Sequence, residues 1–391
     1  MNYAFGDTTK GDYAYESAPN STDLTWETVI TKNIGLDLGF LNNRLNVSFD
    51  AYIRDTKDML MAGKTLPGVY GASSPRMNVA DLRTKGWEAS ITWGDSFTLA
   101  SKPFNYRIMA GIGDNTSKVT KYDNPNRTLT DPYEGQQLGE IWGYVVDGYF
   151  KTDEEARNYK VDQSFVNQMI NASALDNGLH AGDLKFVDLD GNNKIEQTTS
   201  ANDRKDMKVI GNSLPRYNYN FGISADWYGI DFSVLFQGIG KQNWYPGAET
   251  SMFWGPYSRP CSSFIPADFM SQVWSEENTD AYFPRPRGYV ALGSNRELAV
   301  VNTKYLQNLA YCRLKNLSIG YTLPDKWLSK IGFEKIRVYF SGENLLTFTK
   351  LHSDYIDPEQ ASASNSWKTS KSDANIYPWA KTYSFGVDIT F

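Results

Sequence analysis

The chain has 391 residues, a formal net charge of −6 and two cysteines, Cys261 and Cys312. The acidic balance argues against nucleic acid as a partner, and the two distant cysteines match no CxxC metal pattern. No apolar run exceeds four residues, which excludes a transmembrane helix. The aromatic and glycine content is high all the same, with 25 Tyr, 20 Phe, 11 Trp and 31 Gly, and this fits transmembrane β-strands.

Nine segments alternate large apolar with small or polar side chains, the pattern of a strand with one apolar and one polar face. A tilted strand crosses a bilayer with about 9–11 residues, and most of these segments are long enough. They predict an all-β wall of antiparallel transmembrane strands. In chain order the predicted strands are residues 33–41, 45–54, 86–93, 104–113, 217–227, 230–236, 314–323, 335–347 and 377–391.

The links between these strands alternate between short and long. Outer-membrane barrels have short periplasmic turns and long extracellular loops, so the alternation predicts which end of the wall faces outwards. A soluble or surface-attached glycan-binding β-sandwich without transport activity also has alternating strands and is the alternative. The short links are residues 42–43, 95–103, 228–229 and 324–334, and the long links are residues 55–84, 114–215, 239–308 and 348–376.

An odd number of strands predicts an incomplete barrel. Single-chain bacterial barrels normally have an even number of strands, and lipid does not tolerate an open sheet edge. We therefore expect residues 1–391 to form the C-terminal portion of a larger β-barrel.

Six ordered motifs give the chain a family resemblance over essentially its whole length. With them it resembles the SusC/RagA-like TonB-linked transporters, which are TonB-dependent receptors of the cell outer membrane. The resemblance implies about nine strands of an expected 22-stranded transmembrane barrel with long extracellular loops. The motifs are NIGLDLGFLNNRLNVSFDAY at 33–52, KGWE at 85–88, GDLKFVDLDGNNKIE at 182–196, VIGNSLPRYNYNFG at 209–222, RLKNLSIGYTLP at 313–324 and IRVYFSGENLLTFTK at 336–350.

The same resemblance implies partners and a transport function. Such a transporter lies among outer-membrane lipids and imports oligosaccharides or peptides together with a SusD-like lipoprotein. Its N-terminal plug and the segment that contacts the TonB complex have no counterpart in residues 1–391. We expect the plug domain and the N-terminal strands to be absent from this sequence.

An acidic loop offers a candidate calcium site. Asp188, Asp190 and Asn192 hold the first, third and fifth positions of an EF-hand-type loop, and Lys194 offers its carbonyl at the seventh. Position six carries asparagine, which tolerates the left-handed backbone, but no glutamate stands at position twelve. Asp203 could serve as the last ligand across a few extra residues. Calcium binding and an Asx-rich turn without metal both remain open.

The long link after residue 239 is rich in aromatic residues, which include Trp244, Tyr245, Trp254, Tyr257 and Trp274. If exposed on a rigid scaffold, such a cluster is a recognition platform for substrate. Otherwise it packs the loop on itself, on the lipoprotein lid or on the plug.

The terminal Phe391 is a candidate assembly signal, because barrels resembling this one end on an aromatic residue that the assembly machinery reads. No catalytic constellation stands out. The two histidines, His180 and His352, lie in predicted loops and neither is near a cysteine or a serine in a nucleophile elbow. We expect no enzyme and no other cofactor.

Overall fold

The structure is a computed structural model. It describes residues 2–5, 9–12, 21, 23–63, 69, 74–167, 178–258, 265–286, 291–293, 296–328, 332–361, 371–372 and 377–391. Cys261 lies outside these residues. No helix in the described part of the chain is both long enough and apolar enough to cross a membrane.

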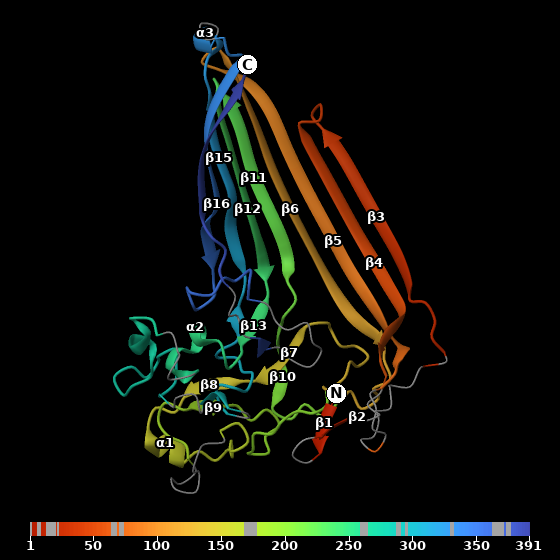
Figure 1. Ribbon diagram of the computed structural model, residues 1–391. Coiled ribbons are helices and arrows are strands. Elements are labelled where there is room, and N and C mark those ends of the chain that lie inside the picture. Colours follow the sequence, from red (N-terminus) through yellow and green to blue (C-terminus); the bar gives the residue numbers. More distant parts are fainter. Residues whose placement is uncertain are drawn as a thin grey trace.

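A sheet of nine antiparallel strands dominates the fold, and each strand pairs with its neighbours along the chain. The strands run side by side as a curved, tilted wall, with the C-terminus at one end and most of the long links at the other (Figure 1). The predicted all-β wall is confirmed. Its strands are β3 (Thr28–Phe40), β4 (Leu45–Ala62), β5 (Arg76–Leu99), β6 (Lys102–Lys121), β11 (Arg216–Trp227), β12 (Ile230–Lys241), β15 (Tyr311–Thr322), β16 (Lys335–Thr349) and β18 (Thr382–Thr390).

The register gathers the apolar residues on one face of this wall. Leu36 lies opposite Phe49, Phe49 opposite Ala89, and Ala89 opposite Ile112. At the other edge Phe340 lies opposite Phe385, which is 84% exposed. A face of large apolar side chains left open to the surroundings is what a lipid-facing barrel surface requires.

The short turns have the chemistry that tight hairpins require. Ala100 and Ser101 join β5 to β6 with φ angles of 48° and 64°, and Tyr228 and Gly229 join β11 to β12 with 52° and 85°. Paired positive φ values define the turn that matches the twist of two adjacent strands. The predicted link at 95–103 was therefore too long, because β5 and β6 continue to this two-residue turn.

The other face of the wall is polar and carries ion pairs between strands. Arg337 on β16 reaches across β15 to Asp231 on β12, with Nη2 2.6 Å from Oδ2. Gly320 on β15 makes this crossing possible, because a Cβ there would stand 2.5 Å from an Asp231 oxygen and 2.6 Å from Arg337 Nε. The alternation in the sequence thus gives the wall one apolar face and one polar face.

The C-terminal edge strand of the sheet is shorter than the sequence predicted. The last strand begins at Thr382, so the predicted extension back through Lys381, Trp379 and Tyr377 was wrong. Asp357 Oδ2 accepts the backbone N–H of Trp379 at 3.2 Å, which holds that segment against a loop instead. Within the described residues, β3 and β18 each have one edge that pairs with no other strand.

The described parts of three long links, at 114–215, 239–308 and 348–376, fold into a second layer at one end of the wall, and the layer contains short helices and small sheets (Figure 1). This layer, which we call the loop layer, also holds 3₁₀ turns at Gly255–Tyr257 and Phe269–Gln272. The remaining elements are β1 (Asn2–Phe5), β2 (Thr9–Asp12), β7 (Glu140–Tyr144), β8 (Val146–Tyr149), α1 (Asp153–Arg157), β9 (Leu184–Phe186), β10 (Met207–Asn212), β13 (Asn243–Pro246), α2 (Ser251–Trp254), β14 (Gln307–Asn308), α3 (Asp325–Leu328) and β17 (Lys371–Ser372).

Candidate functional site

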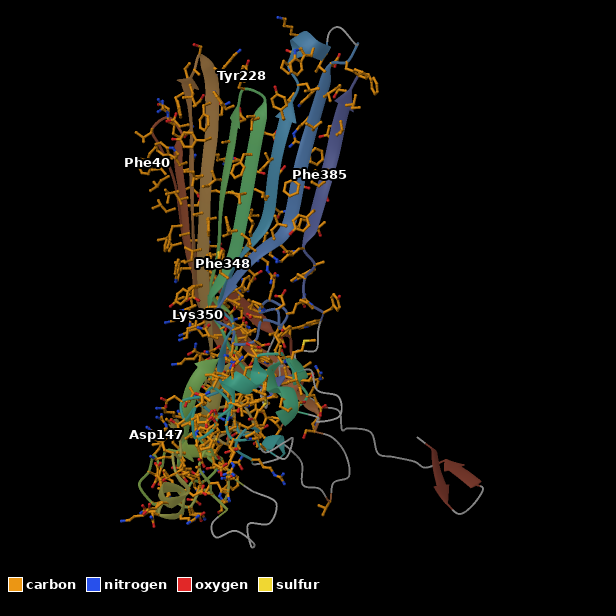
Figure 2. The ribbon with its side chains drawn as sticks, turned by 90° about the vertical axis from the view of Figure 1, so that its left-hand side faces the viewer. Phe40, Asp147, Tyr228, Phe348, Lys350 and Phe385 are labelled. Atoms are coloured by element: carbon orange, nitrogen blue, oxygen red, sulfur yellow. The ribbon has the colours of Figure 1, made fainter. Side chains whose placement is uncertain are left out.

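The hydrophobic core of the molecule lies in the loop layer, whereas the strand wall has an open apolar face. The core joins residues from β7, β9, β13, α2 and the segments 265–286, 291–293, 296–310 and 351–361. Figure 2 shows this layer beneath the wall, with Phe348 and Lys350 labelled where the two meet and Asp147 within the layer. The described parts of the links at 114–215, 239–308 and 348–376 therefore form one folded body and not a set of separate loops.

The five aromatic residues singled out from the sequence are all in this core. Trp244, Tyr245 and Trp254 are fully buried, Tyr257 is 1% exposed and Trp274 is 6% exposed. The sequence left open whether these rings form an exposed platform or pack inside the loop, and they are not an exposed platform because the links pack on one another and enclose them. Of the alternatives from the sequence, packing of the loop on itself describes their place in the structure.

Hydrogen bonds fix the polar ends of two of these rings, Trp254 and Tyr245. Trp254 Nε1 donates to the carbonyl of Gly247 at 3.0 Å, and the Tyr245 hydroxyl donates to the carbonyl of Leu298 at 2.7 Å. Burial raises the pKa of Tyr245, so its hydroxyl stays neutral and keeps its proton for this bond. Satisfied polar ends let large aromatic side chains fill a core without an energetic penalty.

A charged cluster ties the loop layer to the polar face of the wall. Arg313 on β15 is buried, and its two terminal nitrogens each lie 2.6 Å from a carboxylate, one of Asp357 and one of Glu359. Its Nε donates to Thr347 on β16 at 2.9 Å, and Lys315 completes the cluster 2.8 Å from Glu359. We call these residues the Arg313 clamp, because they hold residues 351–361 against the strands. Sequence reasoning missed them, since nothing in the chain signals which carboxylates pair with a strand arginine 44 residues away.

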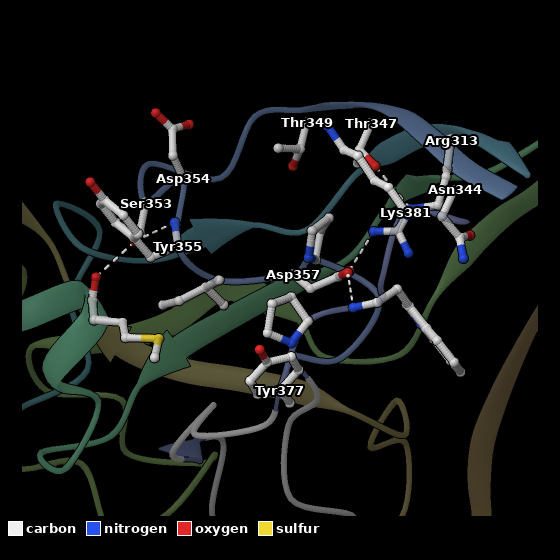
Figure 3. A pocket seen from close by; sticks show the side chains of 15 residues that line it. Arg313, Asn344, Thr347, Thr349, Ser353, Asp354, Tyr355, Asp357, Tyr377 and Lys381 are labelled. Carbon is white, nitrogen blue, oxygen red and sulfur yellow. Dashed lines mark hydrogen bonds and ion pairs between the residues drawn. The ribbon is translucent and has the colours of Figure 1, made fainter. Parts of the chain in front are cut away.

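A cavity of about 560 Å³ opens beside the Arg313 clamp (Figure 3). Tyr355, Tyr377 and Trp379 line it together with the polar side chains of Asn344 and Lys381. Tyr377 and Trp379 are largely exposed. Open aromatic rings beside amide, hydroxyl and ammonium groups can stack on a ligand and hydrogen-bond to it.

The acidic loop gathers carboxylates, although not all of those expected. Oxygens of Asp188, Asp190 and Asp206 lie within 4.8 Å of one another. The group contains Asp206, whereas Asp203, which the sequence offered as the last carboxylate, is not part of it. Asp206 is buried and approaches from the start of the chain segment that forms β10, a contact that spacing alone does not reveal.

The backbone of this loop follows the expected turn. Asn193 has a φ of 61°, and Asp188 accepts the N–H groups of Gly191 and Asn193 at 2.7 Å each. Asn192 Oδ1 accepts the N–H of Lys194 at 2.8 Å. Burial raises the pKa of Asp206, which also accepts two backbone N–H groups. Three carboxylates and an amide oxygen are ligands that calcium prefers, so calcium binding stays a prediction for this loop.

If the loop binds calcium, chelation should raise protease sensitivity between residues 182 and 210 in the complete protein. Asp206→Asn should abolish the protection that calcium gives, whereas Asp203→Asn should preserve it. Because burial raises the pKa of Asp206, this carboxyl should take up a proton early on acidification. Calcium should then dissociate, since a protonated carboxyl no longer serves as a ligand. Digestion patterns that are identical with and without calcium would leave only the Asx-rich turn.

Phe391 follows β18 and is 81% exposed, with its ring centroid 5.1 Å from that of Phe333. It lies at the end of the wall that carries the short turns, away from the loop layer (Figure 1). If Phe391 is the assembly signal expected from the sequence, Phe391→Ala should slow assembly and lower the amount of complete protein in the membrane fraction. Activity per assembled molecule should stay near normal, because the strand backbone is unchanged. Quantitative blotting of membrane fractions checks this, and a wild-type level would identify Phe391 as an ordinary strand residue.

Comparisons with known proteins agree with this geometry. The family model described as TonB dependent receptor-like, beta-barrel matches residues 2–345. TonB-dependent receptor P3 of Formosa agariphila is 28% identical over 388 residues, which cover 94% of this chain and 34% of that protein. TonB-dependent receptor SusC of Bacteroides thetaiotaomicron is 24% identical over 393 residues, which cover 100% of this chain and 34% of that protein.

A solved structure is similar in fold. The RagAB peptide importer in its open-open state matches with a TM-score of 0.67 at 21% identity, covering 100% of this chain and 37% of that chain. This likeness concerns the fold alone. The chain spans about a third of the length of the curated relatives it matches.

Proposed function

Because this chain belongs to the TonB dependent receptor-like β-barrel family, whose members are known as outer-membrane proteins, we propose that the complete protein is an active importer in the cell outer membrane. The observation that carries the proposal is the two-faced wall, apolar outside and polar inside, capped at one end by a folded loop layer. A soluble β-sandwich would bury its large apolar face against a second sheet. Here that face stays open in the described residues.

We propose that the wall is one part of a larger barrel and that residues 1–391 form its C-terminal portion. The unpaired edges of β3 and β18 support this, because a sheet in lipid must satisfy every backbone group. Further strands and a plug domain, supplied outside these residues, would close the barrel and fill it. The polar inner face, with Arg337 and Asp231, would then line the hydrated interior.

For the cargo we propose oligosaccharides or peptides, taken up with a SusD-like lipoprotein and energised by a TonB complex. Resemblance to SusC, and to an importer described as transporting peptides, supports this choice. The cavity beside the Arg313 clamp offers aromatic rings and polar groups of the kind that bind either cargo. The family consists of transporters and receptors, and no enzymatic activity is proposed.

Uptake in cells tests the proposal. Deleting the gene for the complete protein should abolish uptake of labelled oligosaccharides or of labelled peptides, and depleting TonB should have the same effect. Restoring the gene should restore uptake. Unchanged uptake of both cargo classes in the deletion strain would contradict import, and a complete protein that stays soluble without detergent would favour the sandwich.

A further inference from the structure

Basic side chains gather on the outward face of β3 to β6, just beyond its apolar region. Directly opposite residues share a face, so the register defines this set. Lys32 on β3 and Lys85 on β5 lie on either side of Ile53 on β4. One step further from the apolar region, Arg83 on β5 lies opposite Lys118 on β6. We call Lys32, Arg83, Lys85 and Lys118 the basic band.

The charge of this band is largely uncompensated. Asp55 on the same face is held by Arg83 with Oδ1 2.6 Å from Nε, and Asp114 is held by Arg216 at 2.5 Å. Lys32, Lys85 and Lys118 are exposed, and among the described residues none has a carboxylate within 4.0 Å. Within the described residues, this acidic chain of net charge −6 thus places three ammonium groups without an ion-pair partner on neighbouring strands of one face.

The depth of the basic band in the membrane follows from its distance to the open apolar face. Ile34, the neighbouring outward residue of β3, is 72% exposed and belongs to the open apolar face. Lys32 is two residues further along, about 7 Å along the strand. At a strand tilt of about 45° this is about 5 Å of depth, and the polar layer on each side of the hydrocarbon is of similar thickness. The ammonium groups therefore lie where lipid headgroups lie, on the side of the loop layer.

We propose that the basic band binds the phosphate groups of phosphorylated lipids in the outer leaflet. Lysine ammonium groups are point charges that suit phosphate oxygens, and at a membrane surface basic residues attract anionic lipid. The inference rests on the outer-membrane location proposed above. It assigns a specific lipid contact to one sector of the barrel surface, next to β3.

Lipid retention tests the band in the complete protein. The triple substitution Lys32→Gln, Lys85→Gln and Lys118→Gln removes the ammonium groups without touching an ion pair. The control is Lys151→Gln, Lys160→Gln and Lys208→Gln, which removes the same charge from exposed lysines of the loop layer. A third variant with arginine at positions 32, 85 and 118 keeps the charge and should behave like the wild type.

Each protein is reconstituted into bilayers that mix a phosphorylated glycolipid with its dephosphorylated form, and the lipid retained after mild detergent extraction is quantified. The wild type, the control and the arginine variant should enrich the phosphorylated lipid. In the band variant that enrichment should fall by about tenfold or more. Equal enrichment in the band and control variants, or equal retention of both lipid forms by the wild type, would overturn the proposal. Excess inorganic phosphate should leave the enrichment unchanged, and its loss would identify a free-phosphate site instead.

Uptake assays on the same proteins separate this inference from the transport proposal. A wild type that enriches phosphorylated lipid but supports no uptake would leave the lipid contact standing and contradict import. A wild type that imports cargo but retains both lipid forms equally would support import and contradict the lipid contact.

Discussion

Replacing Arg313 by methionine should release residues 351–361 from the strand wall while the nine-stranded sheet survives. Arg313 is the buried centre of the clamp, and its loss leaves the carboxylates of Asp357 and Glu359 without their guanidinium partner. Removing one partner of a buried ion pair costs about 3–5 kcal/mol. The cost falls on the loop, because the backbone ladder of β15 with β12 and β16 does not depend on this side chain.

Hydrogen exchange of the complete protein in detergent measures this release. Amides of residues 351–361 should exchange much faster in the variant, and those of β15 should change little. Arg44→Met is the matched control, because Arg44 forms an exposed pair with Asp95 at 3.3 Å and such pairs contribute about 0–1 kcal/mol. Unchanged exchange at 351–361 in the Arg313 variant would show that apolar packing alone holds the segment.

Trp254→Ala should unfold a large part of the loop layer. The Trp254 ring is fully buried, with its centroid 4.7 Å from that of Phe253 and 5.2 Å from that of Tyr305. Truncating a buried tryptophan costs about 3–5 kcal/mol, because transfer energy is lost and a cavity remains. The core of the layer is shared among several links, so the loss at one position destabilises the others.

Limited proteolysis in intact cells measures this effect, because the alternation of short and long links predicts that the layer lies outside the cell. New cleavage sites should appear between residues 242 and 310, and uptake should fall with them. Trp327→Ala is the control, since Trp327 on α3 is 59% exposed at the opposite end of the wall. A layer that resists protease equally in both variants would show that Trp254 is not central to its core.

Much of the wall could be predicted from residue order alone. Alternation has a period of two, and each residue in a strand must face one side or the other. All nine wall strands were located in this way, and Tyr228 and Gly229 marked their turn directly. The predicted strand ends were less accurate. β5 and β6 extend well past their predicted bounds, because pairing with a neighbouring strand, and not local pattern, decides where a strand stops.

Residue order alone specifies the strands, their two faces and which links are long, since these depend on neighbours along the chain. Other features depend on contacts between distant segments. Trp254 and Tyr257 are core residues and not a platform because separate links close over them. Asp206, and not Asp203, joins Asp188 and Asp190 because the chain returns to the acidic loop before β10. Such contacts depend on which segments lie next to one another in the folded protein. The type and spacing of residues along the chain do not reveal this.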